Sequence, residues 1–95
     1  MIQYTQAEFL QIIKQYNSTD RKIIKANLKR IMGIYGIKPA DIIALGYNSR
    51  NVYAWTNRST SNIPMFNQAL DIAVEFHFDI KEFLRNINID NVKSP

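Results

Sequence analysis

Cysteine is absent from this chain of 95 residues, and histidine occurs only once. Without thiols the chain can form neither a disulfide framework nor a thiolate metal site, and we expect no metal site of any kind. One histidine and no glycine-rich phosphate loop leave no nucleophile–base pair on which catalysis could be built. We therefore expect a protein that is not an enzyme and that needs no cofactor.

Long apolar runs are missing as well. No segment approaches the roughly 18 apolar residues that a membrane-spanning helix needs. The opening residues MIQYTQAEFLQ lack the basic start and apolar stretch of a signal peptide. Because the absence of cysteine also suits a reducing compartment, we expect a cytoplasmic protein with no membrane partner.

Glycine and proline occur three times each, and the alternation typical of strands is nearly absent. Apolar residues recur instead at helical spacing, and they make up 46% of the chain, which is enough for a core. We predict one all-α domain of five or six short helices. Its parts are an extra N-terminal helix in 1–18, a helical domain in 19–86 and a tail in 87–95, which either frays or pairs Ile87 and Ile89 as a strand across a dimer.

The N-terminal helix has strong start signals. Thr5 and Glu8 have the spacing of a capping box, and Tyr4 can pack on Phe9 as a hydrophobic staple. The apolar stripe that follows at helical spacing consists of Phe9, Ile12, Ile13 and Tyr16. Because that stripe must be buried, the helix is interpreted either as an extra packing layer or as a dimer element.

Similar signals divide the rest of the chain into five further helices. The first spans about 20–35 and ends before Gly36, the second runs from Pro39 to about Leu45, and the third runs from Asn48 or Ser49 to about Asn57. Pro64 opens the fourth. Asp79 starts the fifth, with Glu82 at the spacing of a second capping box. On the helix at 20–35 the apolar stripe ends in Tyr35, while its lysines and Arg30 project elsewhere.

Charge is unevenly distributed. Residues 1–58 contain nine basic and three acidic side chains, a net of +6, whereas residues 59–95 contain three basic and five acidic ones, a net of −2. A basic half joined to an acidic half suggests a surface that meets a polyanion. The alternative is that lysines such as Lys14, Lys22, Lys25 and Lys29 only solvate helix surfaces.

The segment 36–58, GIKPADIIALGYNSRNVYAWTNR, is the most informative one. It has the pattern of a short helix, a turn at Gly46 and a second helix with polar outward positions. Val52 and Trp55 stand three apart, so both can face inward and orient that second helix. This layout is typical of a helix-turn-helix, whose second helix lies in the major groove of DNA.

The chain resembles the Cro/Xre-type helix-turn-helix regulators of bacteria and phages over about 25–84. The resemblance is carried by Leu45-Gly46-Tyr47-Asn48, by Val52 and Trp55-Thr56-Asn57, and by Pro64 through Leu84. It implies a lambda-repressor-like fold and a homodimer on an inverted-repeat operator. The helix before the turn is one residue shorter than the family pattern, and Lys38-Pro39 replaces a common phosphate-binding glutamine, so the docking angle stays open. A bias toward Ile, Asn, Lys and Tyr fits an AT-rich genome, as in low-GC bacteria and their phages.

On this interpretation the chain is a sequence-specific transcription regulator, most simply a repressor of phage or mobile-element type. Arg50 can pair bidentately with guanine, and asparagines can pair with adenine. The candidate base contacts are Asn48, Ser49, Arg50, Asn51, Tyr53, Ala54 and Asn57, and the candidate phosphate contacts are Lys38, Arg58, Ser59 and Thr60. Two individual side chains have plainer interpretations: Trp55 as a core anchor and His77 as a helix-ending residue.

One alternative remains open at the level of sequence. The same scaffold can serve as a protein-binding module, in an antirepressor, an antitoxin or a phage-encoded inhibitor of a host system. The outward face of the second helix has one arginine among neutral polar residues, which is few charges for a DNA reader.

Overall fold

The computed structural model describes residues 3–87 of the chain. Within them it has five α-helices, one closing 3-10 helix and no strand, which confirms the all-α class for this part. The elements are α1 (Gln6–Ser18), α2 (Arg21–Tyr35), α3 (Pro39–Ile43), α4 (Ser49–Thr56), α5 (Phe66–Glu75) and η1 (Ile80–Leu84). Of the two residues in the strand interpretation of the tail, Ile87 belongs to no element and Ile89 lies outside the described residues.

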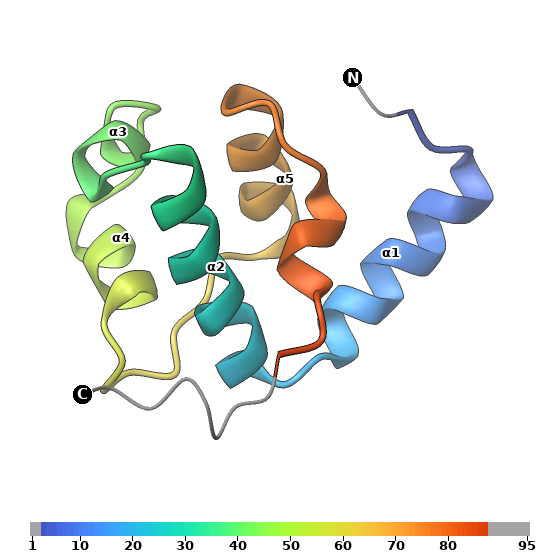
Figure 1. The fold of residues 1–95 in the computed structure, drawn as a ribbon, viewed down its shortest axis with the longest axis horizontal. Helices are drawn as coiled ribbons and strands as arrows, with labels where there is room; N and C mark the ends of the chain where they lie inside the picture. Colours follow the sequence, from blue (N-terminus) through green and yellow to red (C-terminus); the bar gives the residue numbers. More distant parts are fainter. Residues whose placement is uncertain (1–2, 88–95) are drawn as a thin grey trace.

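The arrangement places α2 in the middle of the molecule. α3 and α4 lie on one side of it, and η1 and α1 lie on the other (Figure 1). α5 packs against η1, and α1 packs against both of them from the outside. As a result, α1 forms an extra layer on the side of the molecule opposite α3 and α4.

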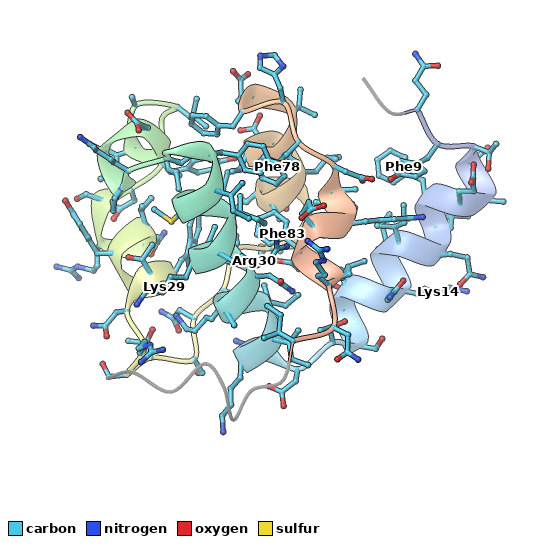
Figure 2. All side chains as sticks on the ribbon, viewed as in Figure 1. Phe9, Lys14, Lys29, Arg30, Phe78 and Phe83 are labelled. Atoms are coloured by element: carbon cyan, nitrogen blue, oxygen red, sulfur yellow. The ribbon has the colours of Figure 1, made fainter. Side chains whose placement is uncertain are left out.

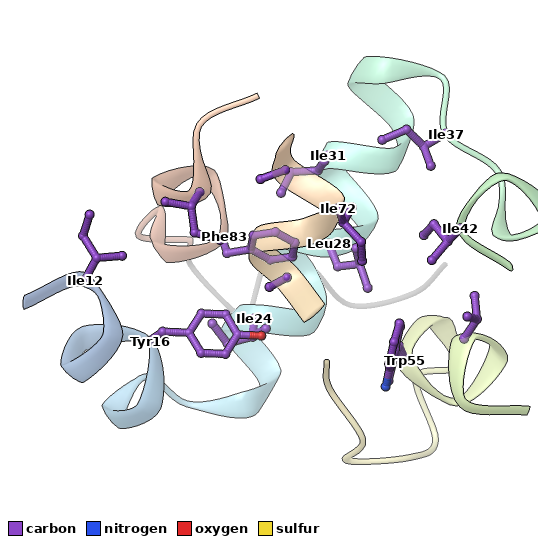
Figure 3. Packing of buried hydrophobic residues seen from close by; sticks show 14 residues of the cluster. Ile12, Tyr16, Ile24, Leu28, Ile31, Ile37, Ile42, Trp55, Ile72 and Phe83 are labelled. Atoms are coloured by element: carbon purple, nitrogen blue, oxygen red, sulfur yellow. The ribbon is translucent and has the colours of Figure 1, made fainter. Parts of the chain in front are cut away.

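The core runs through all six elements (Figure 3). α2 supplies its centre, because Ile24, Leu28 and Ile31 repeat at helical spacing and are fully enclosed. The residues that meet them are Ile42 from α3, Val52 and Trp55 from α4, Ala69, Ile72 and Ala73 from α5, and Ile80 and Phe83 from η1. The expected inward orientation of Val52 and Trp55 is therefore confirmed.

The start of α1 forms as expected. The Thr5 amide donates to Glu8 Oε1 at 2.8 Å, and the Glu8 amide donates to Thr5 Oγ1 at 3.1 Å, which is a complete capping box. The rings of Tyr4 and Phe9 lie 6.4 Å apart. Ile12 and Tyr16 are buried against the chain's own α5 and η1, so α1 acts as a packing layer within one molecule.

The predicted start of α5 at Pro64 is wrong by two residues. The carbonyl of Pro64 accepts a hydrogen bond from the buried Tyr16 hydroxyl at 2.6 Å, so this segment is tied to α1. The helix begins only at Phe66, after Met65, whose amide donates to Gln68 Oε1 at 2.8 Å. The boundary thus lies between a contact 48 positions away in sequence and a local capping bond.

The predicted capping box at Asp79 is also wrong. Asp79 does accept from the Lys81 amide at 3.0 Å, but the carboxylate of Glu82 pairs with Arg30 of α2 at 2.9 Å. The resulting element is a short 3-10 helix rather than an α-helix. Figure 2 shows Arg30 and Phe83 where α2 meets η1.

A buried polar residue, Asn27, joins the same two elements. Its Nδ2 donates to the carbonyls of Phe83 at 2.7 Å and Arg85 at 2.9 Å, while its Oδ1 accepts from Arg30 Nε at 3.2 Å. The side chain is fully enclosed, so these bonds replace the water that it loses. Asn27 and Arg30 therefore hold η1 on α2.

The sequence also assigned roles to Tyr35, at the end of α2, and to His77, just after α5. Tyr35 is exposed rather than part of the core stripe, and its ring stacks on Phe78 with centroids 5.2 Å apart. His77 has φ of +61°. The amides of His77 and Phe78 donate back to Val74 and Ala73, which is the pattern of a Schellman helix end. The helix-ending role of His77 is confirmed.

Candidate functional site

The segment from α3 to α4 forms two helices joined by a tight turn. α3 ends at Ile43, earlier than the expected Leu45, because the amides of Leu45 and Gly46 donate to carbonyls three residues back. Gly46 then takes φ of +108°, a conformation that side chains rarely adopt. Ile42, fully buried, anchors α3 on the core, so the turn holds α4 at a defined angle to α3.

Tyr47 braces this turn from outside. Its hydroxyl donates to Asp71 Oδ2 on α5 at 2.6 Å, and its ring meets Trp55 edge-on at 5.7 Å. Partial burial and this hydrogen bond together raise the pKa of Tyr47 to about 12. The turn is thereby tied to α5 as well as to α4.

Asn48 caps α4, which settles the choice that the sequence left open between Asn48 and Ser49. Its Oδ1 accepts from the Arg50 amide at 2.8 Å and from the Asn51 amide at 3.4 Å. The cap satisfies amides that the first turn of a helix leaves without partners. Its Nδ2 makes no hydrogen bond within residues 3–87.

The outward face of α4 holds most of the candidate base contacts together. Arg50, Tyr53 and Ala54 lie in its middle, opposite Val52 and Trp55, because residues three and four apart share one face of a helix. Tyr53 is 55% exposed, and Ala54 is half-buried. Exposed residues at the margins of this face are Asn48, Ser49 and Asn51. No acidic side chain lies on α4.

The C-terminal end of α4 is different, because its candidate residues bond to one another. Asn57 Oδ1 accepts from the Ser59 amide at 3.0 Å and from its hydroxyl at 2.9 Å. The Thr60 hydroxyl donates to the carbonyl of Ala54 at 2.6 Å. These side chains build the loop after the helix, which leaves fewer of their polar atoms for a ligand; the neighbouring Arg58 is exposed.

Lys25 of α2 is the residue at this site that sequence reasoning missed. Its ammonium donates to the carbonyls of Ala54 at 2.7 Å, Trp55 at 2.9 Å and Asn57 at 2.9 Å. Partial burial lowers the pKa of Lys25 below its ordinary value. One sequence signal pointed this way: the last turn of α4 has no basic residue, so its carbonyls need a donor from elsewhere.

Lys38 lies at the start of α3, where the resemblance placed a phosphate contact. The side chain is exposed, and its backbone amide donates to Asp41 Oδ2 at 2.8 Å. The carboxylate of Asp41 thus occupies the first turn of α3, where anions are favoured. Lys38 therefore stands beside a negative charge instead of an open helix start.

Other kinds of site find little support in the described part of the chain. Within residues 3–87 no three His, Asp or Glu side chains come close enough to hold a metal ion. In the same range no helix has the length and apolarity to cross a membrane. The chain matches no family model, no curated protein and no solved structure.

Proposed function

We propose that this protein is a sequence-specific double-stranded DNA-binding regulator of the Cro/Xre type with a lambda-repressor-like fold, and that α4 is its reading helix. The observation that carries the proposal is the division of α4 into two faces. Val52 and Trp55 lock one face into the core, and the other presents mostly neutral polar side chains and one arginine, without an acidic residue. A helix held in this way can enter a major groove without deforming.

The chemistry of the outward face suits base edges. Arg50 can donate two parallel hydrogen bonds to guanine, and Asn51 can pair with adenine in the same bidentate manner. Tyr53 and Ala54 can contact the methyl group of thymine. The N-terminal end of α4, which has a partial positive charge, would approach the phosphates along with these side chains.

A homodimer is part of the proposal. Two copies would place two reading helices about 34 Å apart, in successive major grooves of an inverted-repeat operator. Repression would follow from occupancy of a promoter, as expected for a regulator of phage or mobile-element origin. Affinity should fall steeply as salt rises, because basic side chains displace counterions from the phosphates.

The test is an electrophoretic mobility shift at physiological salt with the DNA upstream of the protein's own gene. Arg50→Ala should reduce discrimination between the specific duplex and a scrambled one by about tenfold, the value of one bidentate base contact. Lys38→Ala is the matched control, since it removes one positive charge from the same unit. It should weaken binding to both duplexes alike. An unchanged preference in Arg50→Ala would refute the assignment of α4 as the reading helix.

A second function, as a protein-binding module, is favoured by the low charge of this surface. Arg50 is the single cation on α4, Asp41 adds a carboxylate at the start of α3, and the exposed Tyr53 offers an aromatic contact. An antirepressor, an antitoxin or an inhibitor of a host system would use such a face. Absence of any specific shift, together with a purified partner that binds wild-type protein but not Tyr53→Ala, would favour this function.

A further inference from the structure

We infer that Lys25 is a specificity-determining residue that acts through α4 without touching DNA. The inference rests on the proposed function, because it assigns a cause to the orientation of the reading helix. Its structural part, that Lys25 holds the end of α4, can be tested without DNA.

The first step concerns the carbonyls at the end of α4. The last four carbonyls of a helix have no partner within it, and in a helix of eight residues they are a large share of the backbone. Lys25 Nζ takes two of these carbonyls, Ala54 and Trp55, together with that of Asn57 just beyond the helix end. Thr60 Oγ1 donates to the Ala54 carbonyl as well, at 2.6 Å. The end of α4 is therefore joined to α2 by hydrogen bonds from a cation, which are stronger than neutral ones.

The second step concerns electrostatics. The C-terminal end of a helix has a partial negative charge, which would repel DNA phosphates if it faced them bare. An ammonium group directly on those carbonyls offsets that charge. Because the ammonium of Lys25 already donates to three protein carbonyls, this lysine should displace no phosphate counterion of its own.

The third step separates Lys25 from its neighbours on α2. Lys29, labelled in Figure 2, is exposed one turn further along α2. Within residues 3–87 its side chain makes no hydrogen bond or ion pair. It has the same charge and lies on the same helix, but it does not contact α4 through hydrogen bonds. Lys29→Met is thus a matched control for Lys25→Met, since both substitutions remove one ammonium from α2.

The DNA-independent experiment is amide hydrogen exchange. Lys25→Met should lower the protection of the Trp55, Thr56 and Asn57 amides about tenfold relative to wild type, as expected for loss of charge-assisted bonds at a helix end. Lys29→Met should leave these amides unchanged. Equal protection in Lys25→Met and wild type would overturn the inference.

The DNA experiment uses a duplex selected by the wild-type protein from a random-sequence pool and a scrambled duplex of the same composition. The specificity ratio, the Kd for scrambled DNA over the Kd for selected DNA, should fall about tenfold in Lys25→Met, with an unchanged slope of log K against log salt. A residue that only stabilises the fold would leave this ratio unchanged in the folded protein. If Lys25→Met instead weakens both duplexes equally and lowers the slope by about one, Lys25 contacts phosphate and the inference is wrong.

Two further results distinguish a failure of the Lys25 inference from a failure to fold and from a failure of the proposed function. Should Lys25→Met fail to fold, Thr60→Val removes the other side-chain donor to the Ala54 carbonyl and should lower the ratio in the same direction; an unchanged ratio there would refute the role of this helix end. If the wild-type protein enriches no duplex, the proposed function fails. The hydrogen-exchange result still decides whether Lys25 holds α4.

Discussion

Asn48 offers a test in which protein stability and DNA affinity should move in opposite directions. Its Oδ1 accepts from the amides of Arg50 and Asn51, and it stands at the end of α4 that would lie deepest in the groove. Two substitutions separate these two roles. Asn48→Ala removes the acceptor, whereas Asn48→Asp keeps the acceptor and adds a negative charge.

The size of each stability effect follows from the cap. Loss of an N-cap acceptor costs about 1 kcal/mol, which lowers Tm by roughly 4–8 °C in a domain of this size. An aspartate at the same place retains both hydrogen bonds and gains about 0.5 kcal/mol from the helix dipole. Thermal unfolding followed by far-UV circular dichroism should therefore give a lower Tm for Asn48→Ala and an equal or higher Tm for Asn48→Asp.

DNA binding should rank these variants differently. The new carboxylate of Asn48→Asp would face phosphates and base acceptors, so affinity for the selected duplex should fall by at least about tenfold. Asn17→Asp, on α1, makes the same charge change on the side of α2 opposite α4 and should bind nearly as wild type. If folded Asn48→Asp bound DNA like the wild type, the start of α4 would not lie at the DNA. If Asn48→Ala kept its Tm, the cap itself would be in doubt.

Two predictions concern the fold. Asn27→Leu should lower the free energy of unfolding in urea by about 2–4 kcal/mol, because it leaves the Phe83 and Arg85 carbonyls and Arg30 Nε without a partner; a loss under about 0.5 kcal/mol would contradict this. Stability should also fall as pH rises from about 10 toward 12. Partial burial, together with a hydrogen bond, raises the pKa of Tyr4 and of Tyr47 from 10.0 to about 12, and burial also raises the pKa of Tyr16. In this pH range the folded state therefore holds protons that the unfolded state releases. Tyr47→Phe should reduce this alkaline loss, and an unchanged pH profile would speak against the Tyr47–Asp71 bond.

Features that depend on nearby residues could be predicted from the sequence. The capping box of Thr5 and Glu8, the cap at Asn48 and the helix ends at Gly36 and His77 are formed by residues within a few positions of each other. The inward pair Val52 and Trp55 follows from helical spacing alone. Local chemistry determines these features, and the fold class follows from their sum.

Features set by distant partners could not be predicted in the same way. Tyr16 binds the carbonyl of Pro64 just before α5, and the carboxylate of Glu82, expected to complete a capping box at Asp79, pairs with Arg30 instead. In the sequence Lys25 has the pattern of a surface lysine, and its contact with the Ala54 carbonyl depends on the position of α4 beside α2. In each case a side chain that has several possible partners binds a residue more than 25 positions away. The spacing of residues along one helix contains no information about which partner that is.

The two ends of α4 therefore contribute unequally to the proposed reading surface. Near its C-terminal end the polar groups of Asn57, Thr60 and Lys25 are largely occupied by protein atoms. In the first turn, the side chains of Ser49, Arg50 and Asn51 make no hydrogen bond within residues 3–87. Since an unpaired donor in solvent can exchange water for a base edge at little cost, sequence should be read by this first half. The second half would then serve to hold the helix in place, through Lys25 and Trp55.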